Sequence, residues 1–234
     1  MPTQGRDQQI PSAATDNEPR TPLTRDRVLR AALDFVDEHG LDALTMRKLG
    51  TALGVEGTAL YNHVHGKDGI LDGLVELLWA EVRANTDTDS AWQDVLRSLA
   101  RSLRETAHRH PKAAHLACSR AVMPMDALQL MADCLTKMER AGFDRPTAAR
   151  AGCAVFGHAY GYALMELMTR SCGPGEPEPE TESQRIRRVT QALPPDVSDD
   201  LFDIGLAVCG CDTNTNFEAG IDLIIAGLRP QRRR

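Results

Sequence analysis

The residue types that could perform catalytic or metal chemistry are present in this sequence, but not at the spacing that such sites require. Glu105 to His108 forms a Glu-x-x-His element of the kind found in di-iron helical bundles, which need a second such element and two further glutamates. No second Glu-x-x-His occurs in the chain, so we expect no iron site. Three other histidines offer isolated ligands only: His110, His115 and His158.

The six cysteines likewise lack the spacing of a structural site. No Cys-x-x-Cys pair occurs, and Cys209-Gly-Cys211 supplies two sulfur ligands where a zinc site needs more. A glycine-rich phosphate loop, a nucleophile elbow and a pair of catalytic carboxylates are also missing. The sequence therefore predicts no catalytic residues, no metal ligands and no cofactor. An all-α enzyme or metal-binding protein remains the alternative hypothesis.

The segment from Thr45 to Lys67 has the spacing of a helix-turn-helix. A capped helix that ends at Gly54 is followed by a tight turn and by a second short helix from Gly57 to His63. An earlier helix from Arg25 to His39 would support both. Many helical corners share this pattern, so the pattern alone favours DNA binding and a plain helical corner about equally.

The residues of this segment and its flanks carry a resemblance to a known family. The matching motifs are Ala31-Ala32, Gly40, Leu44-Thr45-Met46-Arg47-Lys48-Leu49, Leu53-Gly54-Val55, Leu60-Tyr61-Asn62-His63-Val64, Lys67 and Ile70-Leu71. On these residues the stretch from Arg27 to Leu71 resembles the DNA-binding domain of the tetracycline repressor (TetR) family. The resemblance implies an all-α, dimeric regulator that represses transcription until a small molecule binds its C-terminal core.

The resemblance and the chemistry of the DNA grooves together give ten candidate DNA contacts. An arginine can donate two hydrogen bonds to one guanine, so Arg47 is the candidate for base reading, and Thr58 could contact a thymine methyl group. Gly57 and Ala59 flank Thr58 where the backbone comes closest to the bases, so we expect direct base reading to be sparse. The remaining candidates are expected at phosphates: Thr45, Lys48, Tyr61, Asn62, His63 and Lys67.

A second resemblance covers the C-terminal part of the chain. The motifs Ala91-Trp92-Gln93-Asp94, Ala141-Gly142-Phe143, Gly157-His158 and Leu223 to Leu228 are similar to the tetracycline-repressor subgroup. We expect an effector cavity among the helices from Trp92 to Thr169, because apolar walls with a few polar groups suit a small organic ligand. The candidate lining residues are Leu99, Leu103, His115, Leu116, Met131, Leu135, Phe156 and Tyr160.

His115 has two interpretations. In the subgroup, a histidine at this place helps to coordinate a drug-bound metal, and a Gly-Thr-Arg-Pro run follows shortly after it. Here the chain reads Ala117-Cys118-Ser119-Arg120. This departure argues against tetracycline itself as the effector. The alternative is that His115 makes a hydrogen bond at a helix end.

Helices must position all these residues, because the hydrophobic periodicity is helical and strand-like alternation does not appear. We expect an all-α fold with a helix-turn-helix domain over 23–72 and a ligand-binding and dimerisation domain over 73–230. Beyond the helices already named, the pattern predicts Lys67–Arg83, Trp92–Arg109, a short helix opened by Pro111, an amphipathic stripe of Leu128, Met131, Leu135 and Met138, and then Pro146–Thr169, Ser198–Ala207 and Asn216–Leu228.

Two of these helices are expected to form a dimer. Pro146–Thr169 carries Gly157 and Gly161, whose small size lets helices approach closely, and it would pair with Asn216–Leu228 and their copies in a four-helix bundle. Burial in this bundle would also explain the apolar stretch 151–169, since Glu166 would be costly inside a lipid bilayer. A two-fold dimer predicts a palindromic double-stranded DNA operator.

Composition and charge limit the remaining possibilities. The chain has 234 residues, of which 42% are hydrophobic, so global disorder is excluded. Its net charge of −6 excludes a protein that coats nucleic acid by bulk charge, and any DNA contact must come from a local patch. We expect a disordered arm over 1–22, a mobile loop over 171–195 and a basic tail over 231–234. Without a signal peptide or membrane span, the expected location is the cytoplasm.

Overall fold

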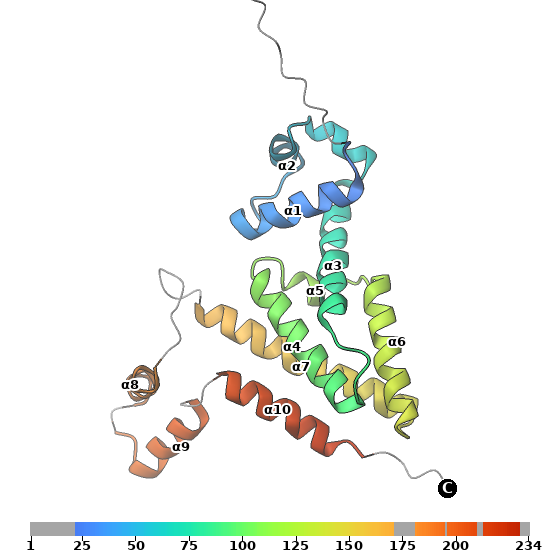
Figure 1. Cartoon of the computed structure of the whole chain (residues 1–234). Coiled ribbons are helices and arrows are strands. Elements are labelled where there is room, and N and C mark those ends of the chain that lie inside the picture. Colours follow the sequence, from blue (N-terminus) through green and yellow to red (C-terminus); the bar gives the residue numbers. More distant parts are fainter. Residues whose placement is uncertain (1–21, 171–180, 195, 210–212, 230–234) are drawn as a thin grey trace, which may run out of the picture.

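The computed structural model describes residues 22–170, 181–194, 196–209 and 213–229, and all regular elements in these ranges are helices (Figure 1). The all-α prediction is confirmed for this part of the chain. The arm predicted before Pro22, the tail predicted over 231–234 and the start of the predicted loop, 171–180, lie outside the described residues.

The N-terminal helices form the predicted helix-turn-helix. They are α1 (Arg25–His39), α2 (Met46–Leu53) and the 3₁₀ helix η1 (Gly57–Asn62). The hydroxyl groups of Thr24 and Thr45 accept hydrogen bonds from the backbone N–H groups of Arg27 and Lys48, and these bonds cap the N-terminal ends of α1 and α2. Gly54 ends α2 with a φ of 69°, a left-handed conformation that favours glycine.

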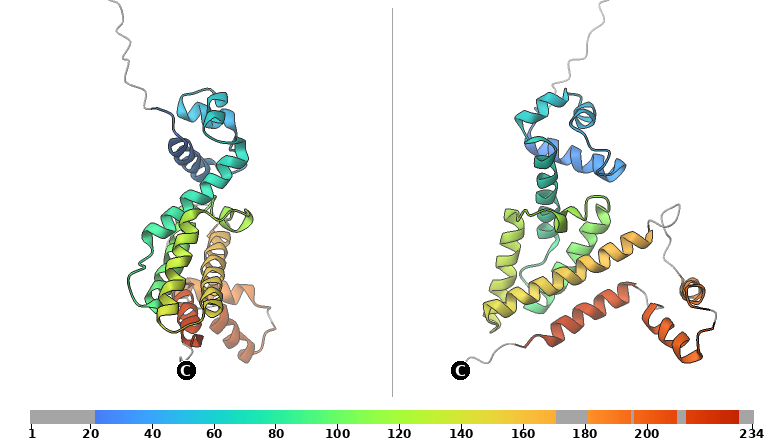
Figure 2. Two further views of the ribbon diagram at one scale, coloured as in Figure 1. Left: turned by 90° about the vertical axis from the view of Figure 1, so that its right-hand side faces the viewer. Right: turned by 180° about the vertical axis from the view of Figure 1, so that it is seen from behind.

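The helix α3 (Gly66–Asn85) joins the two parts of the molecule. Its N-terminal half packs against α1, and its C-terminal half packs against α4 and α6 (Figures 1 and 2). Ile70 and Leu74 are buried near the first half, and Trp79 and Val82 near the second. A movement of the C-terminal half of α3 would therefore also move its N-terminal half, which packs on α1.

The C-terminal part is built around α7 (Arg145–Arg170), which packs on α4 (Trp92–Arg109), α6 (Met125–Arg140) and α10 (Thr213–Gly227). The right-hand view of Figure 2 shows α7 and α10 side by side. One continuous apolar cluster links these helices to the helix-turn-helix core. Within the described ranges, none of the helices combines the length and the apolar character needed to cross a bilayer.

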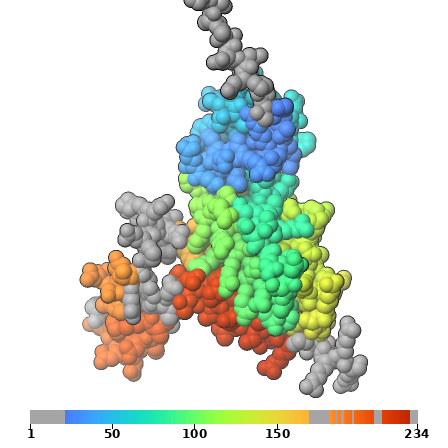
Figure 3. Space-filling model, in the orientation of Figure 1, coloured from blue at the N-terminus to red at the C-terminus, as the bar shows by residue number. Residues whose placement is uncertain are grey.

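The loop expected over 171–195 is wrong in its second part, because the helix α8 (Glu182–Ala192) lies within it. The next helix, α9 (Asp199–Cys209), lies where a helix was predicted. Thr181 and Gln184 form a reciprocal capping box: the Thr181 hydroxyl accepts the Gln184 N–H at 3.3 Å, and the Gln184 side chain accepts the Thr181 N–H at 2.8 Å. The stretch before Thr181 is rich in proline and glutamate, so the sequence pattern predicted a loop that continued past the start of α8. The two helices pack on each other and project from the body as a separate lobe (Figure 3).

Two further expectations were wrong in detail. Residues after Pro111 form turns, and the short helix α5 begins only at Leu116 and ends at Ser119. In α6 the buried face is Ala127, Leu130, Cys134 and Met138, whereas Leu128 and Met131 are exposed. Of the predicted stripe, Met138 is buried as expected, but the buried face runs through Ala127, Leu130 and Cys134, and the small side chains of Ala127 and Cys134 carried too little hydrophobic signal to mark it.

Candidate nucleic-acid interface

A contact between two glycines sets the distance between α2 and η1. A Cβ atom added to buried Gly50 would lie 2.7 Å from the backbone nitrogen of Gly57. One added to Gly57 would lie 2.9 Å from the carbonyl oxygen of Met46. A side chain at either glycine would push the backbone of the other element away, so α2 and η1 can pack this closely only with glycine at both positions.

The candidate DNA contacts gather on the outer side of this α2–η1 unit. Thr45, Arg47, Lys48, Thr58, Tyr61, Asn62 and Lys67 are exposed, and Gly57, Ala59 and His63 are half-buried. Tyr61 leaves 56% of its surface exposed, which is unusual for a large aromatic side chain. Such a ring beside polar groups suits the sugar-phosphate backbone of a duplex. Gly57 packs against α2, where a Cβ atom added to it would meet the backbone of Met46 and Arg47.

The charges of this domain are distributed unevenly. Arg25 donates two hydrogen bonds to Glu76 at 2.7 and 2.9 Å, and Arg30 pairs with Asp26 at 2.8 Å. The side chains of Arg47 and Lys48, by contrast, have no hydrogen bond or ion pair to any residue that the structure describes; only their backbone atoms are hydrogen-bonded, to Thr51 and Thr45. A domain of net negative charge therefore presents its free cations on α2, beside η1.

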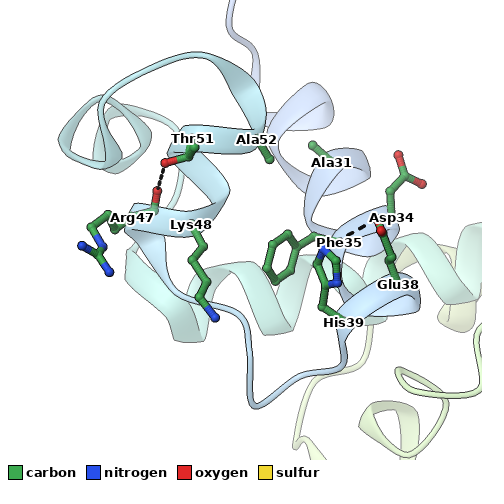
Figure 4. Close-up of a pocket in the computed structure, with 9 residues that line it drawn as sticks. All are labelled: Ala31, Asp34, Phe35, Glu38, His39, Arg47, Lys48, Thr51 and Ala52. Carbon is green, nitrogen blue, oxygen red and sulfur yellow. Dashed lines mark hydrogen bonds and ion pairs between the residues drawn. The ribbon is translucent and has the colours of Figure 1, made fainter.

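A groove of about 610 Å³ runs between α1 and α2 (Figure 4). Asp34, Glu38 and His39 lie on its α1 side, and Arg47 and Lys48 on its α2 side. In Figure 4 the side chain of Arg47 points away from the α1 wall, whereas that of Lys48 does not. The groove is open and of mixed charge, and it contains none of the residues predicted to line an effector cavity.

The predicted effector residues divide into two groups. Six of them belong to the continuous apolar cluster of the C-terminal part: Leu99, Leu103, Leu116, Leu135, Phe156 and Tyr160. Met131 and His115 are exposed instead, and the His115 side chain does not cap α5. Trp79 was not among the predicted lining residues, yet it stacks on Phe156 with ring centroids 5.9 Å apart. It lies on α3, outside the helices from Trp92 to Thr169 where the cavity was expected, although its place beside Leu78 indicated an inward side chain.

A buried ion pair crosses the C-terminal core. Glu166 on α7 is 7% exposed and accepts two hydrogen bonds from Arg104 on α4, at 2.6 and 3.0 Å. His108 lies 2.7 Å from the same carboxylate, and the Arg104 guanidinium stacks on the Phe217 ring of α10 at 4.5 Å. Burial by itself would raise the pKa of Glu166, but Arg104 and His108 together outweigh it and hold that pKa below its usual value.

The short capped helix, the glycine turn, the exposed second helix and the unpaired cations define a DNA-binding protein of the helix-turn-helix class. Comparison with known proteins agrees. Residues 28–74 match the family of bacterial regulatory proteins named tetR, and residues 85–232 match the tetracyclin repressor-like C-terminal domain. The chain belongs to the TetR family, and its class is that of DNA-binding transcriptional regulators.

Individual relatives show how far the similarity extends. An HTH-type transcriptional regulator of Saccharopolyspora erythraea is 33% identical, over 63% of this chain and 63% of its own length. The class A tetracycline repressor protein of Escherichia coli is 30% identical, over 91% of this chain and 93% of that one. ActR of Streptomyces coelicolor, solved in complex with actinorhodin, superposes with a TM-score of 0.72 at 26% identity, covering 88% of this chain and 95% of ActR.

Proposed function

We propose that this chain acts in the cytoplasm as a homodimeric repressor that binds a palindromic operator and leaves it when a small molecule binds the C-terminal domain. The observation that carries this proposal is the pair of unpartnered cations, Arg47 and Lys48, beside the exposed η1 helix. Because α3 begins at this surface and ends in the apolar C-terminal core, it supports a mechanical link between the two.

The base-reading role falls mainly to Arg47. Gly57 packs against α2, so the first residue of η1 offers the groove no side chain. Thr58 follows Gly57 directly, and the Cα atom of Arg47 would lie 3.2 Å from a Cβ atom added at Gly57. Both side chains are exposed, and Arg47 has the two-pronged geometry that suits guanine. Thr45, Tyr61, Asn62, His63, Lys48 and Lys67 would position the duplex through its phosphates.

The dimer would form through α7 and α10. Along α7 the exposed residues include Cys153, Gly157, Gly161 and Met165, and along α10 they include Leu223. A Cβ added at Gly157 or Gly161 meets no atom within 4 Å, so the space outside these glycines is open to a second helix pair. Small residues at helical spacing flanked by exposed methionine and leucine fit burial against a second copy.

The effector is proposed to be a small organic molecule with planar rings. Trp79 stacks on Phe156, and Phe156 lies 4.7 Å from Tyr160, so three aromatic side chains follow one another between α3 and α7. Their faces suit a planar aromatic ligand. ActR, which superposes on this chain, was solved with actinorhodin. The exposure of His115 and the changed run after it favour a ligand other than a metal-bound tetracycline.

Binding of such a ligand can reach the DNA surface through Arg120. Arg120 follows α5 and pairs with Asp72 and with Asp68, the latter at 3.3 Å, in the first turns of α3. Asp68 directly follows Lys67, a candidate phosphate contact. A shift of α5 would therefore move the N-terminal end of α3 and change the spacing of the two helix-turn-helix domains in the dimer.

The test begins with selection of bound sequences from a randomised duplex pool. The selected operator should be palindromic, with half-sites about 34–36 Å apart or a multiple of that spacing. Arg47→Ala should weaken its binding by roughly 1–3 kcal/mol and relax one base position in each half-site. Arg30→Ala is the matched control, because Arg30 is already paired with Asp26. Failure to enrich any sequence, or equal effects of the two substitutions, would refute the proposal.

A further inference from the structure

His110 connects the helix-turn-helix domain to the C-terminal domain. It follows the last residue of α4, and its side chain is only 11% exposed. The Nδ1 atom lies 2.6 Å from Oδ2 of Asp37 on α1, and the Nε2 atom lies 3.0 Å from Oε2 of Glu81 on α3. One imidazole ring therefore lies between two carboxylates from different helices.

Only one protonation state of the ring satisfies both contacts. A neutral imidazole has one N–H donor and one lone pair, and a lone pair facing a carboxylate is repelled. The imidazolium donates from both nitrogens, and the ion pairs shorten and strengthen both hydrogen bonds. The geometry of the two contacts is therefore that of an imidazolium.

Charged groups lie close to the ring on every helix packed around it, but for Asp37 the ring is the cation in contact. Asp37 faces the ring from α1, Glu81 from α3, and Arg109 from α4, where it pairs with the other oxygen of Glu81. Lys112, in the following turn, donates to the carbonyl oxygen of Glu38 at 2.7 Å. The other carboxylate oxygen of Asp37, Oδ1, is buried without a hydrogen bond from any described residue. Loss of the ring proton would leave Asp37 without its cation in a partly buried place.

We propose that protonated His110 is a positioning residue, which fixes the helix-turn-helix domain on the C-terminal domain and makes operator affinity depend on pH. The inference rests on the proposed function. Two helix-turn-helix domains bind a palindrome at once. If each domain is already fixed on its C-terminal domain before binding, less conformational entropy is lost when the complex forms. Operator affinity is therefore higher with the imidazolium and falls as the ring loses its proton.

The experiment measures operator affinity of the full-length protein from pH 5.5 to 8.5 at constant ionic strength, with the duplex selected above. The wild-type dissociation constant should rise by roughly fivefold or more across this range, the size expected for one charge-assisted hydrogen bond. His110→Gln should show a much flatter profile, with weaker binding at low pH. Asp37→Asn, which changes the other side of the same contact, should flatten the profile too, and the double variant should add nothing further.

His39→Gln is the matched control. His39 lies two residues from Asp37 on the same helix and is exposed, so its replacement should leave the wild-type profile intact. His63, at the candidate DNA surface, is present in every variant compared, so the difference between the profiles isolates His110. A His110→Gln profile parallel to that of the wild type, or a wild-type affinity that increases with pH, would overturn the proposal.

The two proposals fail in different ways. If no duplex is enriched at any pH, the DNA-binding proposal is wrong. The His110 contact is then tested by hydrogen exchange at the C-terminal end of α1, where Gly40 donates its N–H to Val36. Protection there should fall with rising pH in the wild type and stay constant in His110→Gln. An unchanged pattern in both proteins overturns the contact itself.

Discussion

Single residues in this protein differ mainly in whether their charge is already neutralised. Arg25, Arg30 and Arg104 each have a carboxylate partner, whereas Arg47 and Lys48 have none among the described residues. The helix-turn-helix domain can therefore be acidic overall and still attract a phosphate backbone at one edge. A chain with a net charge of −6 keeps non-specific binding weak, which favours selective recognition.

The ion pair of Glu166 predicts a dependence of stability on pH. Its pKa is lowered in the folded chain, so its stabilising effect is complete above the usual value of 4.5 and is lost as pH falls through the lowered pKa. Glu166→Gln should reduce the free energy of unfolding by roughly 3 kcal/mol at pH 7, because Arg104 is left buried without its charge partner. Urea unfolding from pH 3 to 7 checks this, since the variant should lose less stability below pH 4.5 than the wild type. Glu105→Gln, at an exposed position on α4, should behave as wild type.

At the scale of elements, close packing through glycine decides where η1 lies beside α2. Gly57→Ala must push η1 away from α2, because the new Cβ would meet backbone at Met46 rather than a movable side chain. We expect operator affinity to fall by at least about tenfold. Expressed as a free energy, this loss should exceed the loss of folding stability measured by thermal unfolding. Gly50→Ala acts on the other side of the same contact and should reproduce the effect. Normal operator binding by both variants would show that the spacing of the two elements is not critical.

A second glycine fixes α10 on α7. A Cβ added at Gly220 would lie 2.2 Å from the ring of His158, which is itself held by a 2.9 Å contact to the carbonyl oxygen of Phe217. Gly220→Ala should therefore destabilise the fold by roughly 1–3 kcal/mol through overpacking. Gly152→Ala, on α7 with open space around the new Cβ, should instead be neutral or slightly stabilising. Calorimetric melting of the two variants provides the comparison, and equal shifts would contradict this explanation.

At the scale of the whole molecule, the proposed dimer brings two helix-turn-helix domains onto one duplex. Leu223 on α10 is 74% exposed in the single chain, and a dimer that forms through α7 and α10 would bury it. Leu223→Glu should shift the sedimentation coefficient at micromolar concentration from dimer to monomer and weaken operator binding. Leu201→Glu, at an equally apolar exposed site on α9 outside this face, should remain dimeric. A stable wild-type monomer would disprove the dimer.

The sequence by itself determined the helices, the helix-turn-helix and the family, because these depend on local patterns: caps at Thr24 and Thr45, the glycine at position 54 and apolar periodicity. It did not determine the buried face of α6, where small Ala127 and Cys134 gave little hydrophobic signal, or the start of α8, where a capping box follows a stretch rich in proline and glutamate. Only the tertiary structure decided which charges are paired. His110, Asp37 and Glu81 are far apart along the chain, and their meeting depends on the crossing of three helices rather than on any local spacing.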